Sequence, residues 1–199
     1  MEQEHLEKIK TAREKYKPEK ITCLFIAEAT PSAPDRFFYF EEVWEQDSLY
    51  LELMKVLLAN DDKENKKNNR LVPLVDIASP STSQLRSKKK NYLEKFKSKG
   101  YYLIDNLDYP MPFGYSRTKE KIRFLEGQKE KLYNKVKTLV DKRTPIVLIS
   151  IPVYQANAGT LEYYGYNVIH NEPIPFPGSG QQARFRGRME EIGKIILQK

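Results

Sequence analysis

The carboxylate of Glu28 directly follows an apolar run, residues 21–27, and precedes an aromatic block that begins with Phe37 and Phe38. A short apolar run is typical of a strand buried in a parallel sheet, and such sheets bind ligands beyond their carboxyl ends. At that edge Glu28 can orient or deprotonate a water, and an exposed ring of the aromatic block can stack a flat base. The alternative is that Glu28 caps a loop or pairs with Arg36 while the aromatic rings fill the core.

Asp105 and Asn106 stand near the end of a second apolar run, residues 101–107. A side-chain amide offers both a donor and an acceptor to the edge of a pyrimidine, whereas an ionised carboxylate only accepts. Asn106 is therefore the better candidate for reading a base, and Asp105 is the other candidate. An Asx turn before Asp108 is the alternative interpretation of this pair.

A loop rich in proline and glycine leads into a C-terminal helix and can bind an anion. Backbone amides at a helix N-terminus attract phosphate, and arginines follow the loop closely. The candidate phosphate- or DNA-binding residues are Pro177, Gly178, Ser179, Gly180, Gln181 and Arg184. The spacing of residues 178–183 formally matches a dinucleotide fingerprint, but no βαβ unit or later acidic residue accompanies it. We therefore expect no NAD or FAD cofactor, and a plain capped turn is the alternative.

The composition limits the classes of function. The 199 residues include 34 Lys and Arg against 27 Asp and Glu, a net charge of +7. This balance favours phosphate-bearing partners such as DNA, or it serves solubility alone. A single cysteine, Cys23, excludes internal disulfides and cysteine-ligated zinc or iron–sulfur clusters, and two histidines, His5 and His170, make a multi-histidine metal centre hard to build.

The sequence predicts a single soluble domain. No signal-peptide pattern opens the sequence and no stretch approaches 18 apolar residues, so we expect an intracellular, cytoplasmic monomer without a membrane partner. Helical periodicity predicts helices at residues 1–18, 49–58, 85–100, 122–140, 153–164 and 185–196. Apolar runs predict strands at residues 21–27, 71–77, 101–107, 145–151 and 166–170, with 71–77 weakened by Pro73 and a polar surface loop before it at 61–70. The alternation predicts a three-layer α/β/α sandwich around a mainly parallel sheet of about four strands.

In this order the motifs resemble those of the uracil-DNA glycosylase superfamily. The segments that carry the resemblance are Ala27-Glu28-Ala29-Thr30-Pro31, the aromatic block with Ser48–Leu53 after it, Leu103-Ile104-Asp105-Asn106, and Pro175-Phe176-Pro177-Gly178-Ser179-Gly180. The first motif lacks the Asp or Asn that many members use to position water, and the last loop lacks their frequent histidine.

The resemblance implies a DNA-repair enzyme that flips a damaged, uracil-type base into a pocket and hydrolyses its bond to the sugar, without a cofactor. Phe37 or Phe38 would stack the base, Asn106 or Asp105 would read its edge, and Glu28 would orient water or stabilise the cationic sugar. Residues 178–181 would hold a phosphate. Two other classes stay open, a nucleic-acid-binding module without chemistry and an enzyme acting on a small nucleotide or phosphorylated substrate.

Overall fold

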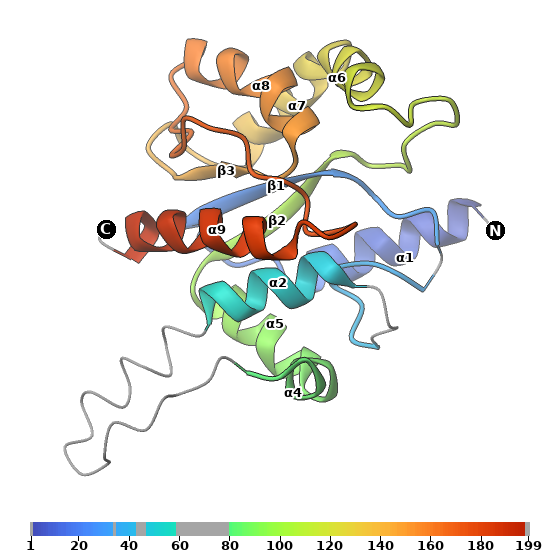
Figure 1. Cartoon of the computed structure of the whole chain (residues 1–199), viewed down its shortest axis with the longest axis vertical. Helices are drawn as coiled ribbons and strands as arrows, with labels where there is room; N and C mark the ends of the chain where they lie inside the picture. The colour runs from blue at the N-terminus through green and yellow to red at the C-terminus, as the bar shows by residue number, and fades with distance from the viewer. Residues whose placement is uncertain (1, 34, 43–46, 59–79, 198–199) are drawn as a thin grey trace.

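The computed structural model describes residues 2–33, 35–42, 47–58 and 80–197 of a mixed α/β protein (Figure 1). Three parallel strands in the order β2-β1-β3 form its sheet, with β1 (Cys23–Ala29) between β2 (Tyr101–Leu107) and β3 (Ile146–Leu148). Cys23 pairs with Tyr101 and Ala27 with Asp105. The carboxyl ends of β1 and β2 therefore meet at one edge, as their apolar runs predict.

The prediction of about four strands is wrong for the described residues, which form three. Residues 166–170 make only one isolated bridge to β3, between Val168 and Ile146. Further along β3, the backbone N–H of Leu148 donates to Nε2 of His170 at 2.9 Å. Because an imidazole takes the hydrogen bond that a strand carbonyl would accept, the ladder does not extend at this position. The predicted strand at 71–77 and the loop at 61–70 lie outside the described residues.

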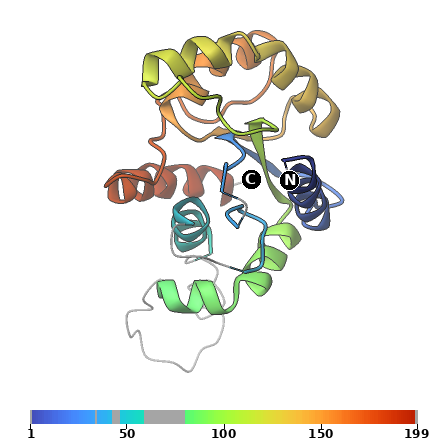
Figure 2. The same ribbon diagram turned by 90° about the vertical axis from the view of Figure 1, so that its right-hand side faces the viewer.

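Helices lie on both sides of the sheet, and both views separate them in the same way (Figures 1 and 2). One side carries α6 (Thr118–Glu126), α7 (Lys129–Leu139) and α8 (Ile151–Tyr163). The other side carries α2 (Ser48–Leu57), α5 (Lys89–Ser98) and α9 (Gln182–Leu197), with α4 (Thr82–Ser87) beyond α5. The N-terminal helix α1 (Glu2–Lys15) is fastened to α5 by a hydrogen bond of 2.9 Å from Lys97 Nζ to the carbonyl of Lys15.

Two predicted helices are each divided in the structure. The stretch 122–140 forms α6 and α7, which meet at Gly127 and Gln128, and both helices pack on α8. Glycine is a poor helix former, so the break falls where the helix is weakest. The basic stretch 85–100 forms α4 and α5, and Ser81 opens α4 with a complete capping box with Gln84.

Candidate functional site

Glu28 is held at the carboxyl end of the central strand by two partners. Lys121 of α6 donates from Nζ to Glu28 Oε1 at 2.6 Å, and Ser150 donates from Oγ to Oε2 at 3.4 Å. The Glu28 side chain is 17% exposed and that of Lys121 is 27% exposed. The carboxylate is thus fixed in orientation but still reachable by water, as a group that acts on water must be.

Ser150 links Glu28 to the start of α8. It adopts a φ of 98°, which is strained for a residue with a Cβ, and its hydroxyl accepts the backbone N–H of Val153 at 3.3 Å. The positive end of the helix dipole therefore lies on the same side of Glu28 as the Ser150 hydroxyl. The predicted strand 145–151 ends early, at Leu148, and this turn at Ser150 is what starts the helix.

Asn106 lies beside Glu28 on the same face of the sheet, because the register pairs Ala27 with Asp105 and Ala29 with Leu107. Its Oδ1 accepts from Asn157 Nδ2 of α8 at 2.7 Å. Nδ2 of Asn106 and Oδ1 of Asn157 are buried without a partner among the described residues. A donor on the strand neighbour of Glu28 and an acceptor on α8 are therefore unused, and leaving them unused costs stability.

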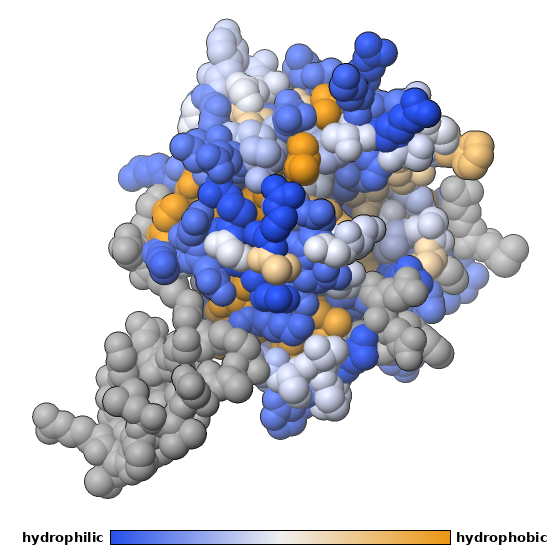
Figure 3. Space-filling model, viewed as in Figure 1, coloured by the Kyte–Doolittle hydropathy of each residue, from blue (hydrophilic) through white to orange (hydrophobic). Residues whose placement is uncertain are grey.

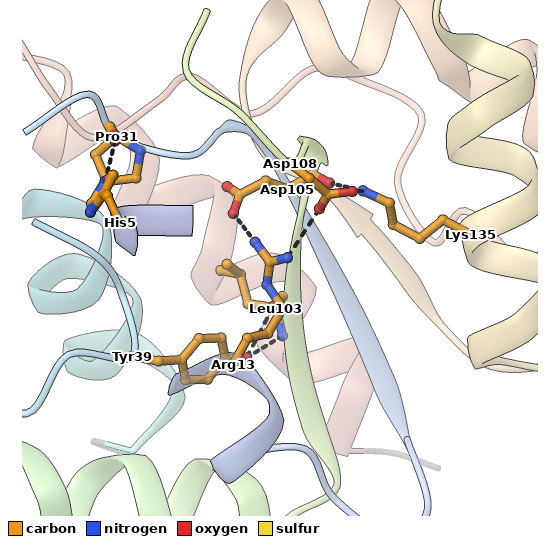
Figure 4. Close-up of polar contacts among 8 residues, drawn as sticks. All are labelled: His5, Arg13, Pro31, Tyr39, Leu103, Asp105, Asp108 and Lys135. Carbon is orange, nitrogen blue, oxygen red and sulfur yellow. Dashed lines mark hydrogen bonds and ion pairs between the residues drawn. The ribbon is translucent and has the colours of Figure 1, made fainter. Parts of the chain in front are cut away.

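Asp105 faces the opposite side of the sheet and forms an ion pair with α1 (Figure 4). Arg13 donates to Asp105 Oδ2 at 2.6 Å and to Asp108 Oδ1 at 3.0 Å. Lys135 of α7 donates to the backbone carbonyl of Asp105 at 3.0 Å and pairs with Asp108 at 2.7 Å. Burial raises the pKa of Asp105, and the charges of Arg13 and Lys135 oppose that rise. Asp105 is thus engaged in attaching α1 on the side of the sheet opposite Glu28.

The aromatic block packs in the core. Phe37 and Phe38 are 4% and 5% exposed, and the ring of Phe38 lies within 5.4 Å of that of Phe96. Tyr39 exchanges two hydrogen bonds with the backbone of Leu103, of 2.7 and 3.1 Å. This burial contradicts the expectation that Phe37 or Phe38 stacks a base in this conformation, because neighbouring aromatic rings cover both. Phe37 and Phe38 fill the core, as the alternative interpretation of the aromatic block predicts.

The loop before α9 forms a tight exposed turn. Ser179 and Gly180 take φ values of 49° and 81°, and the N–H of Gln181 donates to the carbonyl of Gly178 at 3.0 Å. Pro177 is buried at its base, and Arg184 is exposed with Nη1 donating to Gln181 Oε1 at 3.2 Å. The turn has the form of a helix N-terminus open to an anion, and its binding role stays a prediction.

A groove of about 670 Å³ runs between α1 and residues 35–42. Phe40, the half-buried member of the aromatic block, lines it together with Tyr39. Two lysines, Lys8 and Lys15, stand against five carboxylates, of Glu4, Glu7, Asp35, Glu41 and Glu42. This excess of negative charge repels a phosphate backbone, so the groove is not a site for DNA strands.

Comparisons with family models, with curated proteins and with solved structures found no match. Within the described ranges, no three His, Cys, Asp or Glu side chains gather as metal ligands, and each helix is too short or too polar to cross a bilayer. The candidate chemistry of this chain therefore rests on the geometry around Glu28.

The amino-acid sequence alone does not identify the side chains that pair with the candidate residues. Those partners are Arg13, Lys121, Lys135, Ser150 and Asn157. Arg13 lies 92 positions from Asp105, and Lys121 and Ser150 lie 93 and 122 positions from Glu28. Lys135 lies 30 positions from Asp105, and Asn157 lies 51 from Asn106. Spacing along the sequence does not indicate such pairs. The one available signal is that Ser150, like Glu28, is a polar residue near the end of an apolar run.

Proposed function

We propose that this protein is a glycosylase-like hydrolase that binds DNA and cleaves the N-glycosidic bond of a uracil-type base. The observation that carries the proposal is the Glu28 carboxylate, anchored by Lys121 and Ser150 at the edge of the sheet. The three-layer arrangement of the glycosylase superfamily belongs to the same proposal, and the helices on both sides of the sheet support it.

Glu28 acts on water and on the sugar in this mechanism. The bond from C1′ to the base breaks with its electron pair leaving on the base, and a water oxygen bonds to the cationic C1′. Glu28 stabilises that positive charge and accepts the proton of the attacking water, which the released base takes up at the end. The Lys121 ammonium, 2.6 Å from Glu28, stabilises the negative charge on the leaving base.

Asn106 and Asn157 are the proposed readers of the base. An amide-like edge of a pyrimidine carries a carbonyl acceptor beside an N–H donor, which matches the unpartnered Asn106 Nδ2 and Asn157 Oδ1. Both side chains are buried, at 4% and 1% exposure, so a base reaches them only when α8 shifts from the sheet.

A second candidate, a nucleic-acid-binding module without chemistry, is favoured by one observation. Phe37, Phe38 and Asp105, three residues expected to hold a base, are used inside the fold. This candidate keeps the net positive charge of the chain and the loop at residues 178–181 but has no base pocket. It predicts salt-sensitive DNA binding without a released base.

The deciding experiment is a panel of oligonucleotides containing uracil, hypoxanthine, xanthine or a thymine mismatch, scored for alkali-labile abasic sites. Glu28→Gln should lower base release by about 100-fold or more while DNA affinity stays within about two-fold. Glu52→Gln is the control, because Glu52 of α2 is another carboxylate held in ion pairs, with Lys55 and with Arg186 of α9, although it is more deeply buried than Glu28.

Three other outcomes of these measurements would support different conclusions. Equal release by wild type and Glu28→Gln removes Glu28 from the mechanism. DNA binding with no abasic product from any oligonucleotide supports the binding module. Tight binding of a mononucleotide without affinity for DNA supports a small-molecule enzyme.

A further inference from the structure

The loop between β2 and α6 presents a fully exposed aromatic ring. Phe113 is 106% exposed, the highest value among the exposed large apolar residues of the described chain. Pro110 and Pro112 restrict the backbone before it, and Gly114 turns the chain after it with a φ of 98°. An exposed phenyl ring does not contribute the free energy that its burial would give. A stiff loop that holds such a ring in solvent can bury it on binding a partner.

Positive charge follows the ring directly. Residues 113–123 hold four cations and one acid, Glu120, a net charge of +3. Arg117, Lys119 and Arg123 are exposed and form no ion pair with another described residue, and the Glu120 carboxylate accepts the N–H of Arg117 at 3.0 Å. The face seen in Figure 3 is largely hydrophilic, with only small apolar areas. The loop and the first turns of α6 thus match a partner that combines negative charge with flat apolar groups.

Both ends of the loop are held by ion pairs. Asp108 at its start binds Arg13 and Lys135, and Lys121 just beyond its end binds Glu28. The loop is thus connected through Lys121 to the carboxylate that the proposed function uses.

We infer that Phe113 is a wedge that inserts between base pairs of duplex DNA, while Arg117, Lys119 and Arg123 bind the flanking phosphates. This inference rests on the proposed function, because the nucleotide that the wedge displaces is the one offered to Glu28. Aromatic and aliphatic side chains at loop tips open base steps in this way. A duplex fits better than a lipid surface, because a single ring suffices as a wedge whereas membrane binding needs a broader apolar face.

The test uses a DNA duplex with 2-aminopurine, whose fluorescence rises when the base is unstacked. Phe113→Ala should weaken duplex binding by about 5-fold to 150-fold and abolish the fluorescence rise, because stacking on an aromatic ring is lost. Phe113→Leu should retain most of both signals, since leucine also serves as a wedge. Tyr163→Ala, which removes a ring 85% exposed on α8, should bind within about two-fold of wild type. Single-stranded binding should change little in Phe113→Leu.

Three results overturn the inference. They are unchanged duplex binding by Phe113→Ala, absence of any 2-aminopurine response in wild type, and Phe113-dependent binding to phosphatidylserine vesicles without duplex binding. Unstacking is read without bond cleavage, so a protein that releases no base in the oligonucleotide panel still gives a clear result here.

Discussion

Replacing Arg13 by methionine tests whether a buried ion pair holds α1 against the sheet. Methionine is similar in length but carries no charge. The side chains of Arg13 and Asp105 are 12% and 6% exposed, and their closest atoms lie 2.6 Å apart. In the variant, Asp105 keeps only the nearby charge of Lys135, whose ammonium contacts its backbone carbonyl and the Asp108 carboxylate.

The expected loss is about 3 kcal/mol of unfolding free energy at neutral pH. Removing one partner of a buried ion pair costs about 3–5 kcal/mol, because the other charge stays buried and uncompensated. Lys135 offsets part of that penalty, which places the loss at the low end of the range. A chain of this kind has about 5–15 kcal/mol in total, so the loss is readily measured.

The penalty should shrink as the pH falls. Burial raises the pKa of Asp105 above 3.8, and Arg13 opposes the rise, so losing Arg13 raises that pKa further. An acid with a raised pKa in the folded state loses stability as the pH rises through that value and regains it as the pH falls. The loss in Arg13→Met should therefore be larger at pH 7.5 than at pH 4.0, which is close to the ordinary carboxyl pKa of 3.8 where the dependence begins.

Urea unfolding followed by circular dichroism at both pH values measures these differences. Asp105→Asn combined with Arg13→Met should recover about 1–2 kcal/mol relative to Arg13→Met alone, since no charge is left buried. Lys8→Met is the control, because its pair with Glu4 is 65% and 69% exposed and should be worth under about 1 kcal/mol. A loss below about 1 kcal/mol in Arg13→Met, or an equal loss at both pH values, refutes the reasoning.

Two further predictions concern the fold around the sheet. Gly100→Ala should destabilise the protein by about 1–3 kcal/mol in thermal unfolding, because Gly100 has a φ of 74° and a Cβ would lie 2.6 Å from Thr22 Cγ2. Gly193→Ala on α9, where a Cβ meets nothing within 4 Å, should be neutral or stabilising by up to about 1 kcal/mol. A larger loss of stability in Gly193→Ala than in Gly100→Ala contradicts this reasoning. Burial lowers the pKa of His170, whose Nε2 accepts from Leu148, so wild-type stability should fall as the pH drops below about 6.5. His170→Gln keeps a hydrogen-bond acceptor but takes up no proton, so its stability should depend less on pH in this range. An equally steep loss of stability below pH 6.5 in this variant would show that His170 is not the cause.

The apolar runs carried enough information to place the central strands. The run at 101–107 coincides with β2, and that at 21–27 overlaps β1, which begins at Cys23 and continues through Glu28. Strands buried on both faces need uninterrupted apolar residues, so their positions are written locally. The strand predicted at 166–170 does not form a ladder with β3, because the backbone N–H of Leu148 donates to the imidazole of His170 and not to a strand carbonyl.

The faces of the sheet were not predictable in the same way. Alternation along a strand places Asp105 and Asn106 on opposite faces, but only the register of β1 against β2 decides that Asn106 shares the face of Glu28. Asp105 then falls on the side of Arg13. Asp105, the carboxylate next to Asn106 in the sequence, therefore forms an ion pair with Arg13 and does not share the face of Glu28.

By itself, the sequence determined the positions of β1 and β2, the polar residues at their carboxyl ends, and the basic composition of the chain, because each depends on neighbouring residues or on composition. Only the tertiary structure decided which of those polar residues are satisfied and which are reachable. It buried Phe37 and Phe38, paired Asp105 with Arg13, and left Glu28 part-exposed between Lys121 and Ser150. Ion pairs and burial depend on side chains brought together across roughly a hundred positions of the chain, and such distances are set by packing and register alone.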